Sequence, residues 1–141
     1  MQRWPLRPDA GAEFCLRPEL RVLVVDDEED LQQLLTMRLT VRGYDVAGVG
    51  TGEHALASLA QRPAELVVLD VRLPGMDGLE TLEHIMRDYP ETHVIMLTGY
   101  ADPTLIAEVQ ARGVFAFMMK PVLISELLEK IEQAQAQSEA L

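Results

Sequence analysis

The sequence has one cysteine and few basic residues, and both shortages limit the classes of function that the protein can have. Cys15 cannot form a disulfide within the chain, which agrees with a reducing compartment. Only 12 lysine and arginine residues stand against 23 aspartate and glutamate residues, so the formal net charge is −11. Because a nucleic-acid interface is normally basic, we expect no direct contact between this chain and nucleic acid.

Long apolar runs are also missing. No segment approaches the ~20 apolar residues that a helix needs to cross a bilayer. The N-terminal stretch also lacks the apolar segment of a signal peptide, because it is interrupted by Pro5, Pro8, Asp9 and Glu13. The sequence therefore predicts a cytoplasmic protein without membrane contact.

The length and composition fit one globular domain with short flanks. The 141 residues are 48% apolar and 25% charged, which is ordinary for a domain with a buried core. Residues 1–18 carry three prolines and no periodic pattern, so we expect a flexible or loosely packed extension. The periodic part covers residues 19–136, and a polar tail follows over 137–141.

Five short apolar runs alternate with segments of helical periodicity. The first, third and fourth runs are almost purely apolar, as in strands buried on both faces of a parallel sheet, whereas the run over 46–49 is typical of an edge strand. Two short patterns are typical of helix N-termini. One is Asp77 with Glu80 three residues later, and the other is Asp102 followed directly by Pro103. This alternation predicts an α/β fold: a doubly wound sheet of five parallel strands with five helices. The runs are Val22–Val25, Val46–Val49, Leu66–Leu69, Val94–Leu97 and Val114–Met119.

Polar residues follow four of these runs, and in such a sheet the ligand site lies beyond the carboxyl ends of the strands. We therefore expect three carboxylates, a hydroxyl and an ammonium group to meet at one edge. They belong to Asp26 and Asp27 after the first run, Asp70 after the third, Thr98 after the fourth and Lys120 after the fifth, with Pro121 next in the chain.

This set of side chains is suited to phosphoryl chemistry with a hard cation. Three neighbouring carboxylates repel one another unless a cation offsets them, and Mg²⁺ prefers oxygen ligands and completes its shell with phosphate oxygens. A carboxylate can also act as the nucleophile that forms an aspartyl-phosphate. Lys120 and Thr98 could contact the phosphoryl oxygens.

Each residue also has a purely structural interpretation. Asp26 and Asp27 could cap the first helix, because acidic residues favour its first turn. Asp70 could be a loop acid, Lys120 a solvated strand end and Phe117 a core residue. What favours the chemical interpretation of the three aspartates and Lys120 is that their side chains are expected to meet at one edge.

Four segments together resemble the receiver domain of two-component signalling, and the resemblance covers nearly the whole periodic region, from Glu19 to Ala136. It implies a flavodoxin-like sheet with strand order 2-1-3-4-5 and a switch that a sensor histidine kinase or a phosphotransfer protein phosphorylates. The segments are VLVVDDEED, VVLDVRLPGMDGLETL, VIMLTGYAD and FMMKP.

The resemblance also assigns roles to individual residues. Asp70 would be the phosphoacceptor, and Asp27, Asp70 and the backbone carbonyl of Arg72 would bind Mg²⁺ directly. Asp26 would assist mainly through water, and Lys120 would contact the phosphoryl group. The peptide bond between Lys120 and Pro121 would be cis.

A switch is implied as well. Thr98 and Phe117 would be its moving pair, and the surface formed by the fourth helix, fifth strand and fifth helix would change, with homodimerisation through that surface as a further expectation. Arg72 and Tyr100 would flank the path by which water reaches the phosphorus. Because both are large, we expect a long-lived phosphoryl group.

Two other functions are compatible with parts of the pattern. A metal-dependent phosphatase of the haloacid-dehalogenase group also uses an aspartyl-phosphate, but it needs Asp-x-Asp after the first strand, where this chain has Asp26, Asp27 and Glu28. A receiver-like interaction module that is never phosphorylated usually loses an acidic residue or the lysine. This chain keeps them all.

Overall fold

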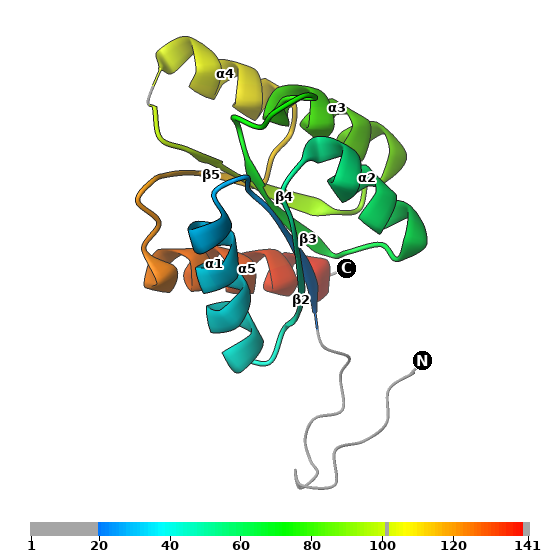
Figure 1. Ribbon diagram of the computed structural model, residues 1–141, viewed down its shortest axis with the longest axis vertical. Helices are drawn as coiled ribbons and strands as arrows, with labels where there is room; N and C mark the ends of the chain where they lie inside the picture. Colours follow the sequence, from blue (N-terminus) through cyan, green and yellow to red (C-terminus); the bar gives the residue numbers. More distant parts are fainter. Residues whose placement is uncertain (1–19, 101, 140–141) are drawn as a thin grey trace, which may run out of the picture.

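The computed structural model describes residues 20–100 and 102–139, so the predicted extension 1–18 lies outside the described residues. Five strands and five helices alternate along this described part of the chain, as the alternation of apolar runs and helical segments predicted (Figure 1). They are β1 (Arg21–Val25), α1 (Glu29–Val41), β2 (Asp45–Val49), α2 (Gly52–Gln61), β3 (Leu66–Asp70), α3 (Gly78–Asp88), β4 (His93–Thr98), α4 (Pro103–Ala111), β5 (Ala116–Met119) and α5 (Ile124–Glu139).

The strands form one parallel sheet in the order β2-β1-β3-β4-β5. This confirms the predicted fold class and the position of β2 at an edge. All five residues of β3 are buried, whereas β2 is only partly covered. Each strand of a parallel sheet points the same way, so the carboxyl ends of all five strands lie at one edge.

Helices cover both faces of the sheet, with α1 and α5 on one face and α2, α3 and α4 on the other (Figure 1). Alternate residues of β1 enter the two layers: Val22 and Val24 belong to the same core cluster as Leu35 of α1, whereas Leu23 belongs to the other cluster, with Leu82 of α3. Burial of each such aliphatic side chain stabilises the fold by roughly 1.5–3 kcal/mol relative to an exposed one.

The helix starts agree with the sequence pattern. Asp77 Oδ1 accepts a hydrogen bond from the backbone N–H of Glu80 at 2.9 Å. Asp102 Oδ1 accepts one from the N–H of Thr104 at 3.0 Å, and Pro103 occupies the first turn of α4. A cap fixes where its helix begins, and therefore fixes the loop that leads into it from the carboxyl edge of the sheet.

The predicted strand ends agree with the structure to within one residue, except at the start of the fifth strand. The fifth strand begins at Ala116, two residues later than predicted. Helix α5 continues to Glu139, so the predicted tail 137–141 is helical as far as the structure describes its backbone. Alanine and glutamine favour a helix, and the buried Ala134 ties this last part to the core. Among the described helices, none is long and apolar enough to span a membrane.

Candidate functional site

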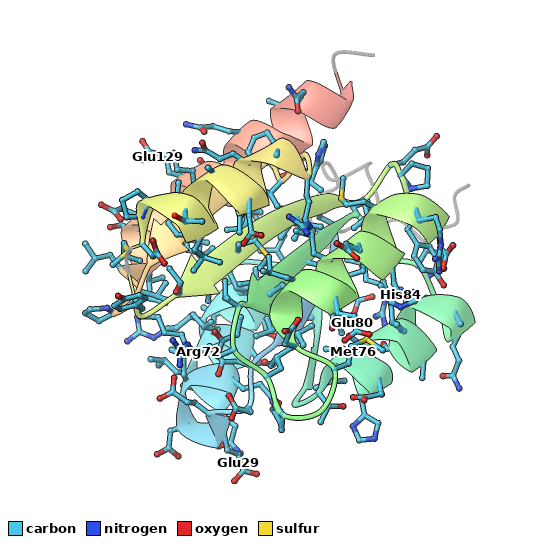
Figure 2. All side chains as sticks on the ribbon, turned by 90° about the horizontal axis from the view of Figure 1, so that it is seen from above. Glu29, Arg72, Met76, Glu80, His84 and Glu129 are labelled. Atoms are coloured by element: carbon cyan, nitrogen blue, oxygen red, sulfur yellow. The ribbon has the colours of Figure 1, made fainter. Side chains whose placement is uncertain are left out.

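The carboxyl edge of the sheet brings together the side chains that the sequence predicted to meet there. Asp26 and Asp27 follow β1, Asp70 ends β3 and Lys120 follows β5. Arg72 and Met76 lie in the two halves of the loop that joins β3 to α3, beside this edge (Figure 2).

Three carboxylates form a compact cluster: one oxygen each of Asp26, Asp27 and Asp70 lies within 4.8 Å of the other two. Asp26 is 1% exposed and Asp70 4% exposed, whereas Asp27 faces solvent. Burial, and then the negative charge of Asp70, raise the pKa of the Asp26 carboxyl. The cluster therefore requires positive charge nearby to remain ionised.

Lys120 supplies part of that charge. Its Nζ atom lies 3.0 Å from Asp70 Oδ2, 3.1 Å from Asp26 Oδ2 and 2.7 Å from Glu28 Oε1. Burial disfavours the charged ammonium, but the carboxylates, Glu28 first, outweigh burial and raise the pKa of Lys120 above its usual value. Lys120 is therefore a permanent cation beside Asp70 at neutral pH.

The carboxylate oxygens are arranged to take a further cation. Backbone N–H groups orient two of them: the N–H of Glu28 donates to Asp26 Oδ1 at 2.8 Å, and the N–H of Arg72 donates to Asp70 Oδ1 at 3.2 Å. Asp26 Oδ2 is buried and has no hydrogen-bond partner among the described residues, because its 3.1 Å contact with Lys120 Nζ lacks hydrogen-bond geometry. All the ligand atoms of this cluster are oxygens, and Asp26 Oδ2 keeps a lone pair that no hydrogen bond from a described residue uses. Such a donor set fits Mg²⁺.

The structural alternative for the acidic pair receives little support. The N-cap of α1 is Glu28, and the acidic residues in the first turn are Glu29 and Asp30. Asp26 orients the chain just before the helix, through its bond from the Glu28 N–H. The carboxylates of Asp26 and Asp27 belong to the cluster.

Thr98 and Phe117 lie on neighbouring strands. Thr98 is buried, and its Oγ1 donates to the carbonyl oxygen of Tyr100 and accepts from the N–H of Tyr100, both at 3.1 Å. Phe117 pairs with Met96 in the sheet and is partly buried against the core that lies under α2, α3 and α4. In this structure the hydroxyl of Thr98 is therefore hydrogen-bonded to the backbone of the loop that follows β4.

Arg72 and Tyr100 line, together with Asp70, an open pocket of about 530 Å³. Tyr100 is 58% exposed, and Arg72 also faces solvent. The Lys120–Pro121 peptide bond is cis. The remaining lining residues are Asp27, Glu28, Gly99 and Lys120.

Two residues of the site were missed by sequence reasoning. Gln32 of α1 donates from Nε2 to the carbonyl oxygens of Asp26, at 3.0 Å, and of Val49, at 2.9 Å, and so joins the ends of β1 and β2. Glu28 contacts Lys120, 92 residues away in the chain. Position directly after the acidic pair was the one available signal for Glu28; nothing in the sequence singles out Gln32.

An open parallel sheet whose carboxyl edge holds an acidic cluster, a lysine and a threonine defines a receiver module of two-component signalling. The model of the response regulator receiver domain family matches residues 22–132, and the chain belongs to that family.

Curated relatives include transcriptional regulators of which this chain matches only a part. The chain is 37% identical over 118 residues to the transcriptional regulatory protein GlrR of Escherichia coli, covering 83% of this chain and 26% of GlrR. It is 32% identical over 113 residues to the DNA-binding transcriptional regulator NtrC of Salmonella typhimurium, covering 80% of this chain and 24% of NtrC. The chain thus spans about a quarter of the length of these two relatives.

Solved structures of receiver domains match this chain over all or nearly all of their length. A CheY-like receiver domain protein from Methanospirillum hungatei superposes with a TM-score of 0.83 at 33% identity, covering 88% of this chain and 100% of that one. The receiver domain of NtrX from Brucella abortus gives a TM-score of 0.74 at 34% identity, covering 80% and 96%.

Proposed function

We propose that this receiver domain takes a phosphoryl group onto Asp70 from a sensor histidine kinase or a phosphotransfer protein. The observation that carries the proposal is the surroundings of Asp70: a nearly buried carboxylate at an open pocket, 3.0 Å from a lysine ammonium and beside two further carboxylates. A carboxylate oxygen of Asp70 forms the new bond to phosphorus. The bond from phosphorus to the donor histidine nitrogen breaks, and the histidine leaves.

The chain's own residues provide position and charge, which are the main requirements of phosphoryl transfer. Lys120 offers a fixed positive charge to the phosphoryl oxygens. Asp27, Asp70 and the backbone carbonyl of Arg72 would hold Mg²⁺, with Asp26 acting mainly through water. When bound, this ion offsets the negative charge of the carboxylates and of the phosphoryl oxygens.

Phosphorylation would act on Thr98. Its hydroxyl is bonded to the backbone of Tyr100, and the phosphoryl oxygens would compete for that hydroxyl. Movement of Thr98 toward Asp70 would leave space for Phe117 and change the surface of α4, β5 and α5, as in a two-state equilibrium biased by new charge-assisted contacts. That surface is our candidate for homodimerisation or for contact with an output domain.

The proposed phosphoryl transfer also indicates where the domain would act and which macromolecules it would contact. The donor histidine is phosphorylated at the expense of ATP, so we place the domain in the cytoplasm. With a net charge of −11, the domain would not contact nucleic acid itself. Any effect on DNA would be exerted by an output domain outside this chain.

One experiment separates this function from the two alternatives. The protein is incubated with acetyl phosphate and Mg²⁺, and both the bound phosphoryl group and the released inorganic phosphate are followed. We expect one phosphoryl group per chain and slow phosphate release. Continuous fast release would indicate a phosphatase, and no adduct would indicate an interaction module that is never phosphorylated.

A further inference from the structure

Glu28 makes the shortest of the three carboxylate contacts to Lys120. Its Oε1 atom lies 2.7 Å from Nζ, compared with 3.0 Å for Asp70 Oδ2 and 3.1 Å for Asp26 Oδ2. The three partners differ in burial, since the Glu28 side chain is 62% exposed and those of Asp26 and Asp70 are 1% and 6% exposed. Glu28 is therefore the outer carboxylate on this lysine.

The backbone position of Glu28 supports a specific role for its side chain. Glu28 is the N-cap residue of α1, a place where a side chain normally accepts a hydrogen bond from the first turn of the helix. The Glu28 side chain makes no such bond. It extends to Lys120 instead, at the rim of the pocket that leads to Asp70.

An ammonium group has three N–H donors. On Lys120, hydrogen bonds to Glu28 and Asp70 use two of them, and the buried carboxylate of Asp26 lies 3.1 Å from the same nitrogen. A phosphoryl group arriving at Asp70 needs at least one of these donors. Asp26 and Asp70 are buried and held by backbone N–H groups, whereas Glu28 can swing into water at little cost. The arriving group would therefore displace Glu28.

We propose that Glu28 gates the phosphoryl site: it holds Lys120 in the unphosphorylated domain, yields to the phosphoryl group, and slows phosphorylation by anionic donors. This inference rests on the proposed function of Asp70. Glu28 is a positioning residue, because it acts through Lys120 and through its own negative charge at the pocket mouth.

The test compares Glu28→Gln with Glu29→Gln in the full chain. Both variants remove one negative charge from adjacent exposed positions, but only Glu28 contacts Lys120. The rate constant for phosphorylation by acetyl phosphate is measured at saturating Mg²⁺ over a series of salt concentrations. We expect Glu28→Gln to raise it about two- to fivefold at low salt, the scale of an exposed ion pair, with a smaller gain at high salt.

Another readout needs neither metal nor phosphodonor. The side-chain ammonium signal of Lys120 is followed by NMR in metal-free protein, and we expect it to shift in Glu28→Gln and to stay unchanged in Glu29→Gln. An equal increase of the phosphorylation rate constant in both variants would contradict the proposed role of Glu28, since the loss of one negative charge would then explain the increase. Slower phosphorylation of Glu28→Gln would also overturn it. If the wild type gains no phosphoryl group, the proposed function of Asp70 is wrong, and the proposed role of Glu28 is then wrong as well.

Discussion

Gly78 approaches the end of β3 so closely that a Cβ atom at this position would overlap the backbone carbonyl oxygen of Asp70. The backbone N–H of Gly78 also donates to the carbonyl oxygen of Val71 at 2.9 Å. The loop from β3 to α3 therefore closes tightly against the residue that we propose as phosphoacceptor, and only glycine leaves room for this closure.

Gly78→Ala should destabilise the domain by about 1–3 kcal/mol, because the obstructing atoms are backbone and cannot rotate away. Urea unfolding measures the difference. Gly99→Ala is the matched control, since a Cβ there meets nothing within 4 Å. Equal stability of the two variants would contradict the close packing of α3 against β3.

Mg²⁺ should stabilise the folded domain, because an ion bound only to the native state raises the free energy of unfolding, by about 2.7 kcal/mol at 100 times its Kd. Asp27→Ala should lose most of this gain. Without metal the same variant should be at least as stable as wild type, since a repelling carboxylate is gone. Thermal melting with and without millimolar Mg²⁺ checks both statements.

Glu108→Ala, an exposed acidic residue on α4 outside the carboxylate cluster, provides the control for a general charge effect. It should keep the full response to Mg²⁺. A wild-type melting temperature that does not respond to Mg²⁺ would count against the metal site.

The phosphoryl group should be long-lived, because the large side chains of Arg72 and Tyr100 line the same pocket as Asp70 and should obstruct a water molecule that approaches the phosphorus. Arg72→Ala and Tyr100→Ala should each speed its loss. Dephosphorylation is followed by intact-mass analysis after removal of the donor. If neither variant loses phosphate faster than wild type, steric blocking is wrong.

Much of the site could be predicted because it follows strand ends. A buried apolar run such as Leu66–Leu69 fixes a strand, and the topology of a parallel sheet then brings Asp70 to the same edge as Asp26 and Lys120. The caps at Asp77 and Asp102 could be predicted for a similar reason, since their signals are local.

What could not be predicted depends on side-chain direction and long-range contact. The turn of Glu28 toward Lys120 and the link from Gln32 to Val49 both require the relative position of α1 and the sheet. The end of α5 could not be placed from the sequence, since QAQAQ suits a solvated tail as well as a helix, and packing of Ala134 into the core decides between them.

Phosphorylation should change hydrogen exchange chiefly in α4, β5 and α5, because we propose that Thr98, at the end of β4, and Phe117, in β5, pass the change from Asp70 to that surface. Amide exchange read by mass spectrometry, with and without acetyl phosphate in the presence of Mg²⁺, gives the map. Thr98→Ala should weaken the change while leaving Asp70 available to the donor. Changes confined to α1 and α2 would contradict the switch.

The role of Asp70 as phosphoacceptor is tested by intact-mass analysis of wild type and Asp70→Asn after treatment with acetyl phosphate and Mg²⁺. The substitution keeps the size of the side chain and one acceptor oxygen, which can still accept from the N–H of Arg72. Circular dichroism checks that the fold is intact. We predict one phosphoryl adduct on wild type and none on Asp70→Asn. A full adduct on Asp70→Asn would place the phosphoryl group on another residue and contradict the assignment of Asp70.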